Sequence, residues 1–191
     1  AMGADEAART TFAKNIKTVL EKNKLDGIDL DFEWAENEKE YKDYSLAILK
    51  MREVLGDKYL FSVSLHPVCY KISKEAIEAV DFISLQCYGP SPVRFPIEKY
   101  CSDIQMVLEY GIPKEKLVAG VPFYGVTKDN SKKTEAYFNF VQNGLVTSPA
   151  QNEVIYQGDT YVFDGQDNIR IKTRYAKEQK LKGMMLSLIH I

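Results

Sequence analysis

The sequence contains few cysteines and histidines for its length. Of 191 residues, three are cysteine (Cys69, Cys87 and Cys101) and two are histidine (His66 and His190). The cysteines are odd in number and irregularly spaced, which argues against a disulfide framework and against a Cys-x-x-Cys metal site. Two histidines are also too few for a histidine-based metal cluster. We therefore expect no metal ion and no other cofactor, buried cysteines, and a structural His66.

Long apolar runs and an excess of one charge are also missing. No run approaches the roughly 20 apolar residues of a membrane span, and no signal-peptide pattern opens the chain. Lysine and arginine number 25 against 27 acidic residues, a net charge of -2. Because no basic field is present, nucleic acid and anionic membranes are unlikely partners. A neutral substrate fits this composition better, and the cellular compartment stays open.

One short stretch, from Leu25 to Trp34, is dense in acidic residues. From Gly27 onward it alternates apolar with acidic side chains, the period of a β-strand, with Ile28, Leu30 and Phe32 on one face and Asp29, Asp31 and Glu33 on the other. Its flanks have helical periodicity, so we expect a parallel sheet covered on both faces, with the acids buried. Burying like charges side by side is costly, so such a cluster is seldom kept for stability.

Two other interpretations of the acidic stretch are open. Asp29, Asp31, Glu33 and Glu40 occupy the first, third, fifth and twelfth positions of an EF-hand calcium loop. That loop requires glycine at its sixth position, where this chain has Trp34. The second alternative is a solvated acidic face on an exposed strand. The helical neighbours argue against this alternative.

The remaining chain alternates predicted strands with predicted helices. Apolar periodicity predicts helices at 4–23, 38–55, 73–80, 97–108 and 167–180, and strands at 59–65, 81–88, 117–121 and 183–189. Gly111 is expected to stop the fourth helix, and Asp167 to cap the fifth. Residues 89–92 belong to a loop, and residues 126–160 form a polar excursion rich in turn signals.

The predicted elements indicate one α/β domain. Residues 1–3 resemble a cloning remnant, and residues 4–191 supply five strands alternating with helices. A complete TIM-type (β/α)8 barrel takes about 250 residues, so we expect an incomplete barrel that lacks roughly three strands.

The acidic stretch resembles the signature of a known family. Residues 26–33, DGIDLDFE, are similar to the D-x-x-D-x-D-x-E motif of glycoside hydrolase family 18, the chitinases and related endo-β-N-acetylglucosaminidases. Residues 84–88, SLQCY, and 117–125, ending GVPFYG, resemble that family's sixth and seventh strands. The resemblance implies a (β/α)8 barrel with the acidic motif on its fourth strand, so the first three strands would be the absent ones.

The resemblance also implies a mechanism for hydrolysis of β-1,4-linked N-acetylglucosamine. Glu33 would be the general acid, and the substrate's own N-acetyl oxygen would attack the anomeric carbon, a retaining route without an enzyme nucleophile. Asp31 would orient the acetamide and balance its charge, with Asp29 behind it. Tyr88 would bind the acetamido oxygen. The implied partner is chitin, a chitooligosaccharide or another glycan that contains N-acetylglucosamine.

Five further residues receive roles from the motif matches. Gln86, Tyr124 and Trp34 are candidate substrate contacts, although a core position for Trp34 is equally plausible for an aromatic residue at a strand end. Asp26 and Gly27 are expected to be structural, through a turn at the entry to the strand.

Two departures from the family pattern keep other functions open. Gly89 stands where the family usually has Asp or Asn, and Ser187 stands near the usual position of a Trp that floors the sugar site. A chitinase-like lectin without turnover is therefore one alternative, and an inactive fragment of a larger hydrolase is another. An incomplete barrel also has open strand edges, so we expect self-association through them.

Overall fold

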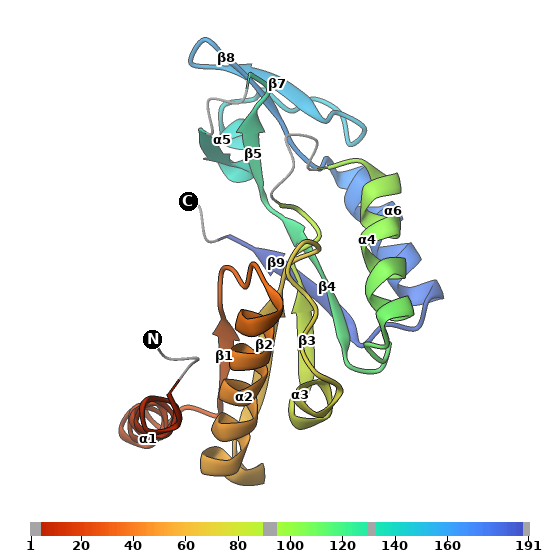
Figure 1. The fold of residues 1–191 in the computed structure, drawn as a ribbon. Helices are drawn as coiled ribbons and strands as arrows, with labels where there is room; N and C mark the ends of the chain where they lie inside the picture. Colours follow the sequence, from red (N-terminus) through yellow and green to blue (C-terminus); the bar gives the residue numbers. More distant parts are fainter. Residues whose placement is uncertain (1–4, 90–94, 130–132, 189–191) are drawn as a thin grey trace.

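The computed structural model describes residues 5–89, 95–129 and 133–188. Its centre is a five-stranded sheet with the order β1-β2-β3-β4-β9, in which all neighbouring strands run parallel (Figure 1). The strands are β1 (Gly27–Asp31), β2 (Leu60–Leu65), β3 (Phe82–Leu85), β4 (Leu117–Pro122) and β9 (Gly183–Ser187). A helix lies between each strand and the next along the chain. This is the predicted α/β fold, a section of a TIM-type (β/α)8 barrel.

The helices follow the predicted apolar periodicity. They are α1 (Glu6–Asn23), α2 (Glu38–Leu55), α3 (Lys74–Ala79), α4 (Ile97–Tyr110) and α6 (Gln166–Glu178), with a 3-10 turn, η1 (Gly56–Lys58), after α2. Ser73 caps α3 as predicted by accepting a hydrogen bond from the Ala76 amide. Gly111 ends α4 in the left-handed conformation that glycine tolerates.

The start of α6 differs from the prediction. Gly165 is the N-cap, and Asp167 lies inside the first turn, where its carboxylate accepts a hydrogen bond from Arg170 at 2.5 Å. The carboxylate of Asp164, the residue before this N-cap, accepts a hydrogen bond from Lys172 of α6 at 2.5 Å. Asp164 is thus bound to α6 through Lys172, a contact that the local capping rule could not reveal.

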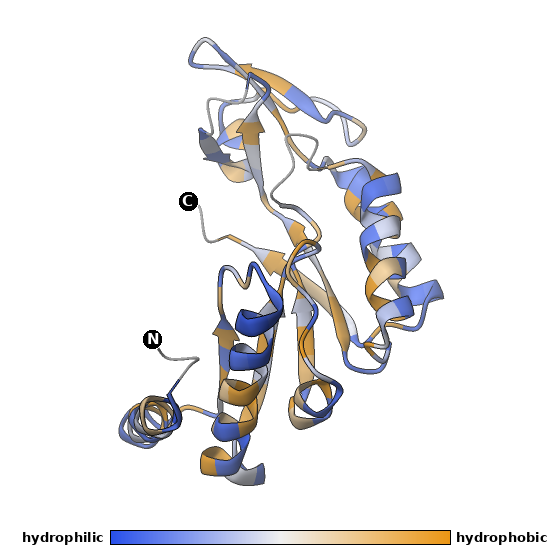
Figure 2. Ribbon diagram, viewed as in Figure 1, coloured by the Kyte–Doolittle hydropathy of each residue, from blue (hydrophilic) through white to orange (hydrophobic). Residues whose placement is uncertain are grey.

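The core lies between the sheet and its helices. Residues of β2, β3 and β4 that point toward the helices are at most 2% exposed and belong to one apolar cluster, among them Phe61, Val63, Ile83, Leu85 and Leu117. Figure 2 shows hydrophobic residues along the central strands and both hydrophobic and hydrophilic residues in the helices. The opposite face of the sheet carries small and polar residues, so it is the face available for a site.

Residues 124–162 form a folded insertion between β4 and α6. It contains β5 (Tyr124–Thr127), β6 (Thr134–Ala136), α5 (Tyr137–Gln142), β7 (Glu153–Tyr156) and β8 (Asp159–Val162). The strands make an antiparallel sheet in the order β6-β5-β8-β7, which stands beyond the carboxyl ends of the main strands (Figure 1). Phe140, Val154, Tyr161 and Phe163 form its own core. The polar excursion predicted at 126–160 is thus an ordered sheet, whose short strands and frequent turns concealed its periodicity.

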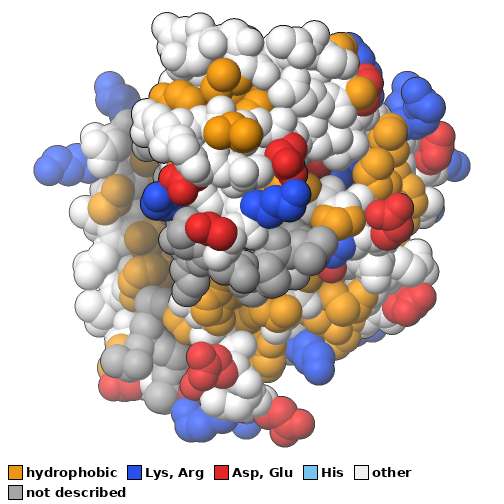
Figure 3. All heavy atoms as spheres, turned by 90° about the horizontal axis from the view of Figure 1, so that it is seen from above, with side chains coloured by type: hydrophobic (Ala, Val, Ile, Leu, Met, Phe, Trp, Pro, Cys, Tyr) orange, Lys and Arg blue, Asp and Glu red, His pale blue; other side chains and the backbone are white. Residues whose placement is uncertain are grey.

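The surface seen from the insertion end carries mixed charges. Figure 3 shows acidic and basic side chains interspersed with hydrophobic ones on this face. Within the described ranges, no helix is long and apolar enough to span a membrane. The predictions made for residues 1–3, residues 90–92 and the end of the last strand at residue 189 lie outside the described residues.

Candidate active site

The acidic strand β1 has the two faces that its alternation predicts. Leu30 is buried toward the helices, and its carbonyl accepts a hydrogen bond from the Tyr44 hydroxyl of α2 at 3.1 Å. The Phe32 ring lies 5.2 Å from the Tyr44 ring on the same side. Asp29 and Asp31 therefore point to the opposite face of the sheet.

Gly27 allows β1 to approach β2 closely. A Cβ atom at this position would lie 2.3 Å from the carbonyl oxygen of Leu60, which is backbone and cannot turn away. The carbonyl of Asp26 accepts a hydrogen bond from the Leu60 amide at 2.9 Å. These contacts hold the start of β1 against β2.

Two serines on β2 hold the Asp29 carboxylate. Ser62 donates to Oδ1 at 2.5 Å and Ser64 donates to Oδ2 at 2.7 Å. Both serines are buried, at 4% and 8% exposure. Because each carboxylate oxygen has its own donor, Asp29 is fixed against β2 and its charge is hydrogen-bonded.

Asp31 is bound from the third strand's end. The Gln86 side-chain amide lies 3.3 Å from both carboxylate oxygens of Asp31. Partial burial raises the pKa of Asp31, the negative charges of Glu33 and Asp29 raise it further, and the Gln86 hydrogen bond opposes them. Asp31 therefore holds its proton to a higher pH than an isolated aspartate does.

Glu33 lies just past the strand. β1 ends at Asp31, two residues earlier than predicted, and the peptide bond between Glu33 and Trp34 is cis. The Glu33 side chain is exposed, and its charge acts on the pKa of Asp31. Glu33 is thus at the carboxyl end of a parallel strand and open to a ligand, the position in which barrel enzymes place their chemistry.

The residues after Glu33 anchor this segment to its neighbours. The half-buried Trp34 ring lies 4.5 Å from the ring of the buried His66, edge to face. The Ala35 amide donates to the Cys69 sulfur at 3.1 Å. The His66 ring is therefore packed against Trp34, and its structural role stays a prediction.

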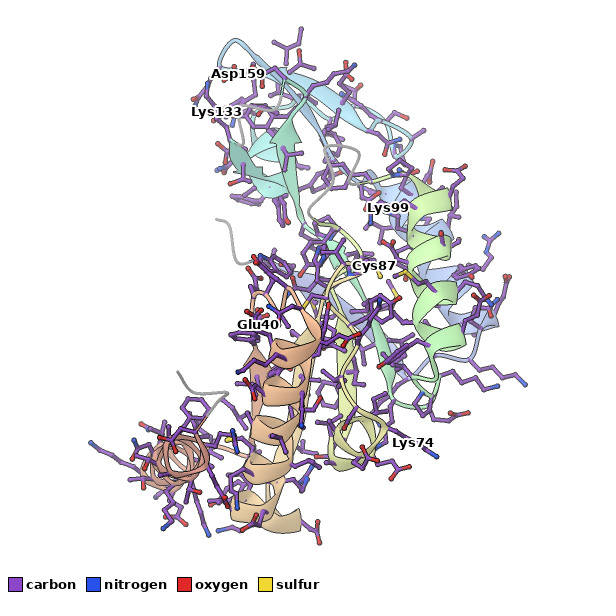
Figure 4. The ribbon with its side chains drawn as sticks, viewed as in Figure 1. Glu40, Lys74, Cys87, Lys99, Lys133 and Asp159 are labelled. Carbon is purple, nitrogen blue, oxygen red and sulfur yellow. The ribbon has the colours of Figure 1, made fainter. Side chains whose placement is uncertain are left out.

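Polar contacts at the start of α2 also order the Glu33 loop. Asn37 caps the helix by accepting from the Glu40 amide at 3.1 Å, and the Glu40 carboxylate accepts from the Glu36 amide at 2.7 Å. Figure 4 places Glu40 at the end of α2 nearest the exit of β1. The calcium-loop alternative is therefore wrong, because Asp29 and Asp31 lie in a strand and Glu40 braces a helix start.

The sequence predicted buried acids, and this prediction is wrong. Asp29, Asp31 and Glu33 are all exposed residues. β1 is at one edge of the described sheet and pairs with β2 alone. The prediction assumed cover on both faces of every strand, which holds only for the face that contacts the helices.

Tyr88 lies at the same end of the sheet as the acids. It is 7% exposed, and its hydroxyl is 4.0 Å from the Met185 sulfur of β9. Burial raises the Tyr88 pKa to about 12, an effect that a hydrogen bond with the Ser187 side chain opposes. The hydroxyl therefore keeps its proton near neutral pH and can donate it to an acceptor.

The ring of Tyr124 packs against the ring of Tyr88. It is 1% exposed, and the two rings lie 6.2 Å apart in an edge-on contact. Burial leaves Tyr124 no surface for a sugar, so the predicted substrate contact is not supported. A Cβ atom at Gly120 would lie 2.9 Å from the Tyr88 ring, which shows how tightly that ring is held.

The cysteines stand apart from the acidic cluster. Cys69 and Cys87 are buried and Cys101 is half-buried, and all three are free thiols. Burial raises the pKa of Cys87 to about 12, and Figure 4 shows this residue between the sheet and α4. Among the described residues, no group of three or more His, Cys, Asp or Glu side chains is placed to hold a metal ion.

Sequence reasoning missed the contacts that organise the acids. It noted small polar residues on one face of β2 but did not join Ser62 and Ser64 to Asp29. It assigned Gln86 to the substrate and did not foresee that its side-chain amide also bonds Asp31. The alternation of serine with apolar residues in β2 is the signal from which a polar lining could have been inferred.

These features define a carboxylate site at the open end of a partial barrel, and comparison with known proteins identifies its family. The family model described as glycosyl hydrolases family 18 matches residues 1–187. The chain belongs to this family of hydrolases.

Individual relatives agree with the family match. The chain is 27% identical over 148 residues to "Probable chitinase 2" of Drosophila melanogaster, a match that covers 65% of this chain and 31% of that protein. The chain thus spans less than a third of that relative's length.

Solved structures with this fold include enzymes and a lectin. A chitinase from Bacteroides thetaiotaomicron has a TM-score of 0.83 at 21% identity, over 97% of this chain and 63% of that one. A chitinase-like agglutinin from Robinia pseudoacacia has a TM-score of 0.81 at 19% identity, over 99% of this chain and 70% of that one. Structural similarity at these sequence identities establishes the fold alone. Whether such a fold hydrolyses a sugar or only binds it depends on the residues of the site.

Proposed function

We propose that this chain carries the catalytic carboxylates of a chitinase-type hydrolase that cleaves β-1,4-linked N-acetylglucosamine with retention of configuration. The observation that carries the proposal is that three acids at one end of the sheet lie in three different environments. Asp29 is held by two serines, Asp31 is held by Gln86 with a raised pKa, and Glu33 is exposed at the strand's end. Acids in such different environments are suited to different tasks in one reaction.

Glu33 is the general acid in this proposal. Its proton passes to the glycosidic oxygen as the bond from that oxygen to the anomeric carbon breaks. The substrate's acetamido oxygen forms a new bond to the same carbon, which gives an oxazolinium ion and removes the need for an enzyme nucleophile. A water molecule, deprotonated by Glu33, then attacks the anomeric carbon and restores the sugar.

Asp31 and Tyr88 act on the acetamido group. Asp31 accepts from the acetamido nitrogen and, when ionised, balances the positive charge of the oxazolinium ion. The protonated Tyr88 hydroxyl donates to the acetamido oxygen. Trp34 beside Glu33 offers a half-buried aromatic face to a sugar ring. The substrate class is chitin, its oligosaccharides or another glycan with this linkage.

Binding without turnover is the second candidate. Gly89 follows Tyr88 where the family pattern has a polar side chain, and Ser187 stands near the usual place of a tryptophan. Ser187 is 2% exposed, so it offers little surface to a sugar. The similarity in fold to an agglutinin agrees with this alternative.

Substitution of the general acid separates the two candidates. In the longest form of the protein that contains these residues, we expect Glu33→Gln to lower kcat on a fluorogenic chitobiose glycoside by at least about 100-fold. Affinity for chitooligosaccharides should remain, because the amide keeps the shape of the side chain. Titration calorimetry measures that affinity.

Glu36→Gln is the matched control, since Glu36 is an exposed glutamate of the same loop. It should leave kcat unchanged. Unaltered turnover in Glu33→Gln would remove Glu33 from the role of acid. Oligosaccharide binding without any turnover in the unsubstituted protein would decide for the lectin.

A further inference from the structure

The ends of two strands that are not neighbours meet at one imidazole ring. His66 follows β2, which lies between β1 and β3 in the sheet. The His66 ring lies 4.5 Å from the ring of Trp34, beyond the end of β1. Toward β3, a Cβ atom added to Gly89 would lie 2.8 Å from Nε2 of His66. One side chain, 2% exposed, therefore lies against both Trp34 and the segment after Tyr88.

His66 fills the space that a side chain at position 89 would occupy. The three atoms nearest to an added Cβ are Nε2 at 2.8 Å, Cδ2 at 3.6 Å and Cε1 at 3.9 Å, and all of them belong to His66. Gly89 does not adopt a positive backbone angle, so a methyl group there meets no backbone strain. The obstacle to a side chain at position 89 is therefore the imidazole alone.

The turn after β2 holds the His66 ring in place. Its Nδ1 accepts a hydrogen bond from the Val68 amide at 3.3 Å. His66 and Cys69 exchange backbone hydrogen bonds, at 3.3 Å and 2.7 Å. The Cys69 sulfur in turn accepts from the Ala35 amide at 3.1 Å. The turn thus binds the segment after β1 at a second point, next to Trp34, which fixes this segment and the ring to one another.

We propose that His66 is a positioning residue that sets the orientation of the Trp34 ring by bracing it against the end of β3 at Gly89. The inference rests on the proposed function for its ligand, since Trp34 is there a contact for a sugar ring. It applies to hydrolysis and to binding without turnover, because both require a bound sugar. An aromatic ring beyond the end of a strand contributes most affinity when its orientation is fixed before the ligand arrives.

The fluorescence of Trp34 tests this coupling in the 191-residue chain, because Trp34 is the only tryptophan in the sequence. Gly89→Ala places a methyl group against Nε2 of His66. The displaced imidazole should change the surroundings of the indole, so the emission maximum of Trp34 should shift.

His66→Asn provides the background in which that shift should vanish. Asparagine has polar atoms near the positions of Nδ1 and Cδ2 and nothing beyond them, so it keeps an acceptor for the Val68 amide. The Cδ2 position is 3.6 Å from the added Cβ, an ordinary contact. Adding Gly89→Ala to His66→Asn should therefore leave the emission maximum of His66→Asn unchanged.

Gly125→Ala is the matched control. An added Cβ there also has its nearest atom at 2.8 Å, in the Phe140 ring of the insertion. It overpacks its surroundings to the same degree and should leave the Trp34 emission unchanged. A Gly89→Ala chain that is folded by circular dichroism and emits like the unsubstituted chain would overturn the inference, as would an equal shift with and without the imidazole. If Gly89→Ala does not fold, a folded double variant supports the coupling and an unfolded one overturns it.

Sugar affinity tests the consequence for binding. In the longest form of the protein that contains these residues, His66→Asn should weaken binding of chitotetraose by about 10-fold, measured by titration calorimetry. Unchanged affinity in His66→Asn would overturn the role of His66 and leave the proposed function standing. Failure of the unsubstituted protein to bind or cleave any chitooligosaccharide would overturn the proposed function, while the fluorescence shifts would still support the bracing of Trp34 by His66.

Discussion

At Gly27 the backbones of β1 and β2 are so close that one methyl group would not fit. The group it would meet is the Leu60 carbonyl, at 2.3 Å from an added Cβ atom. Gly27 begins the strand that carries Asp29 and Asp31, so a shift there would move both acids relative to the serines and Gln86. The need for glycine at this point of the motif is therefore steric, because Gly27 does not adopt a positive backbone angle.

Gly27→Ala should destabilise the fold. We expect it to lower the free energy of unfolding by about 1–3 kcal/mol, as overpacking against a rigid neighbour does. Urea denaturation followed by circular dichroism measures the change. Gly183→Ala is the matched control, because Gly183 is also a strand residue of this sheet and an added Cβ atom there meets nothing within 4 Å. Equal destabilisation of both variants would contradict the steric explanation.

At the scale of elements, a buried ion pair joins the segment between β8 and α6 to α6 itself. Asp164, just after β8, and Lys172 of α6 are 2.5 Å apart, and their side chains are 0% and 2% exposed. The Lys172 ammonium also lies 5.4 Å from the ring centroid of Tyr100 on α4. Burial raises the Asp164 pKa despite the opposing charge of Lys172. The desolvation cost of the buried carboxyl opposes the attraction of Lys172, and the pair fixes Asp164 against α6.

Lys172→Met should leave a buried carboxyl without its cation. We expect a loss of about 3–5 kcal/mol in the free energy of unfolding at neutral pH, measured by urea denaturation. The Asp164 pKa in the folded chain would rise further. At acidic pH the Asp164 carboxyl of the variant is protonated and needs no cation. The destabilisation caused by Lys172→Met should therefore be smaller at acidic pH than at neutral pH.

The double variant Asp164→Leu with Lys172→Met is the control for that experiment. It removes both charges and should recover much of the stability that Lys172→Met loses. A single variant as stable as the unsubstituted chain at neutral pH would show that Asp164 does not depend on its cation.

At the scale of the whole molecule, the parallel sheet presents two edges. β1 and β9 each have one neighbour in the described sheet, on the side of β2 and β4 respectively. Leu186 of β9 is 54% exposed, and Leu25, just before β1, is 47% exposed. Unpaired backbone groups beside apolar side chains are a template for pairing with another chain.

The 191-residue chain should therefore self-associate. We expect light scattering after size exclusion to give a mass above 21.8 kDa, and Leu186→Lys to lower it because charge on an edge strand opposes pairing. Phe138→Lys, at a 66% exposed position of helix α5, should leave the mass unchanged because it lies on no strand edge. A monomer at micromolar concentration would contradict this expectation.

Low turnover by the same chain is expected on the same grounds. Binding energy that distorts a sugar toward its transition state comes from contacts all around the site, and here the face that carries the acids is open at β1. A longer form of the protein should hydrolyse the chitobiose glycoside faster than this chain. Equal rates would show that the described residues already form the complete site.

The sequence by itself determined the features that depend on local rules. Alternation within residues 27–32 divides acidic from apolar side chains, Ser73 and Gly111 mark helix ends, and the apolar run 117–121 is a buried strand. Each of these follows from backbone period or from capping, which act over a few neighbouring residues. The family motif at residues 26–33 was likewise readable without a structure.

Only the tertiary structure decided how the acids are used. Ser64 reaches Asp29 instead of the residue opposite it, and Gln86 reaches Asp31 from two strands away, because strand register and side-chain direction are set by packing. The exposure of the acids and the burial of Tyr124 depend on which elements cover each face. The burial of a side chain depends on the assembled fold, because the residues that pack over it are distant in the chain.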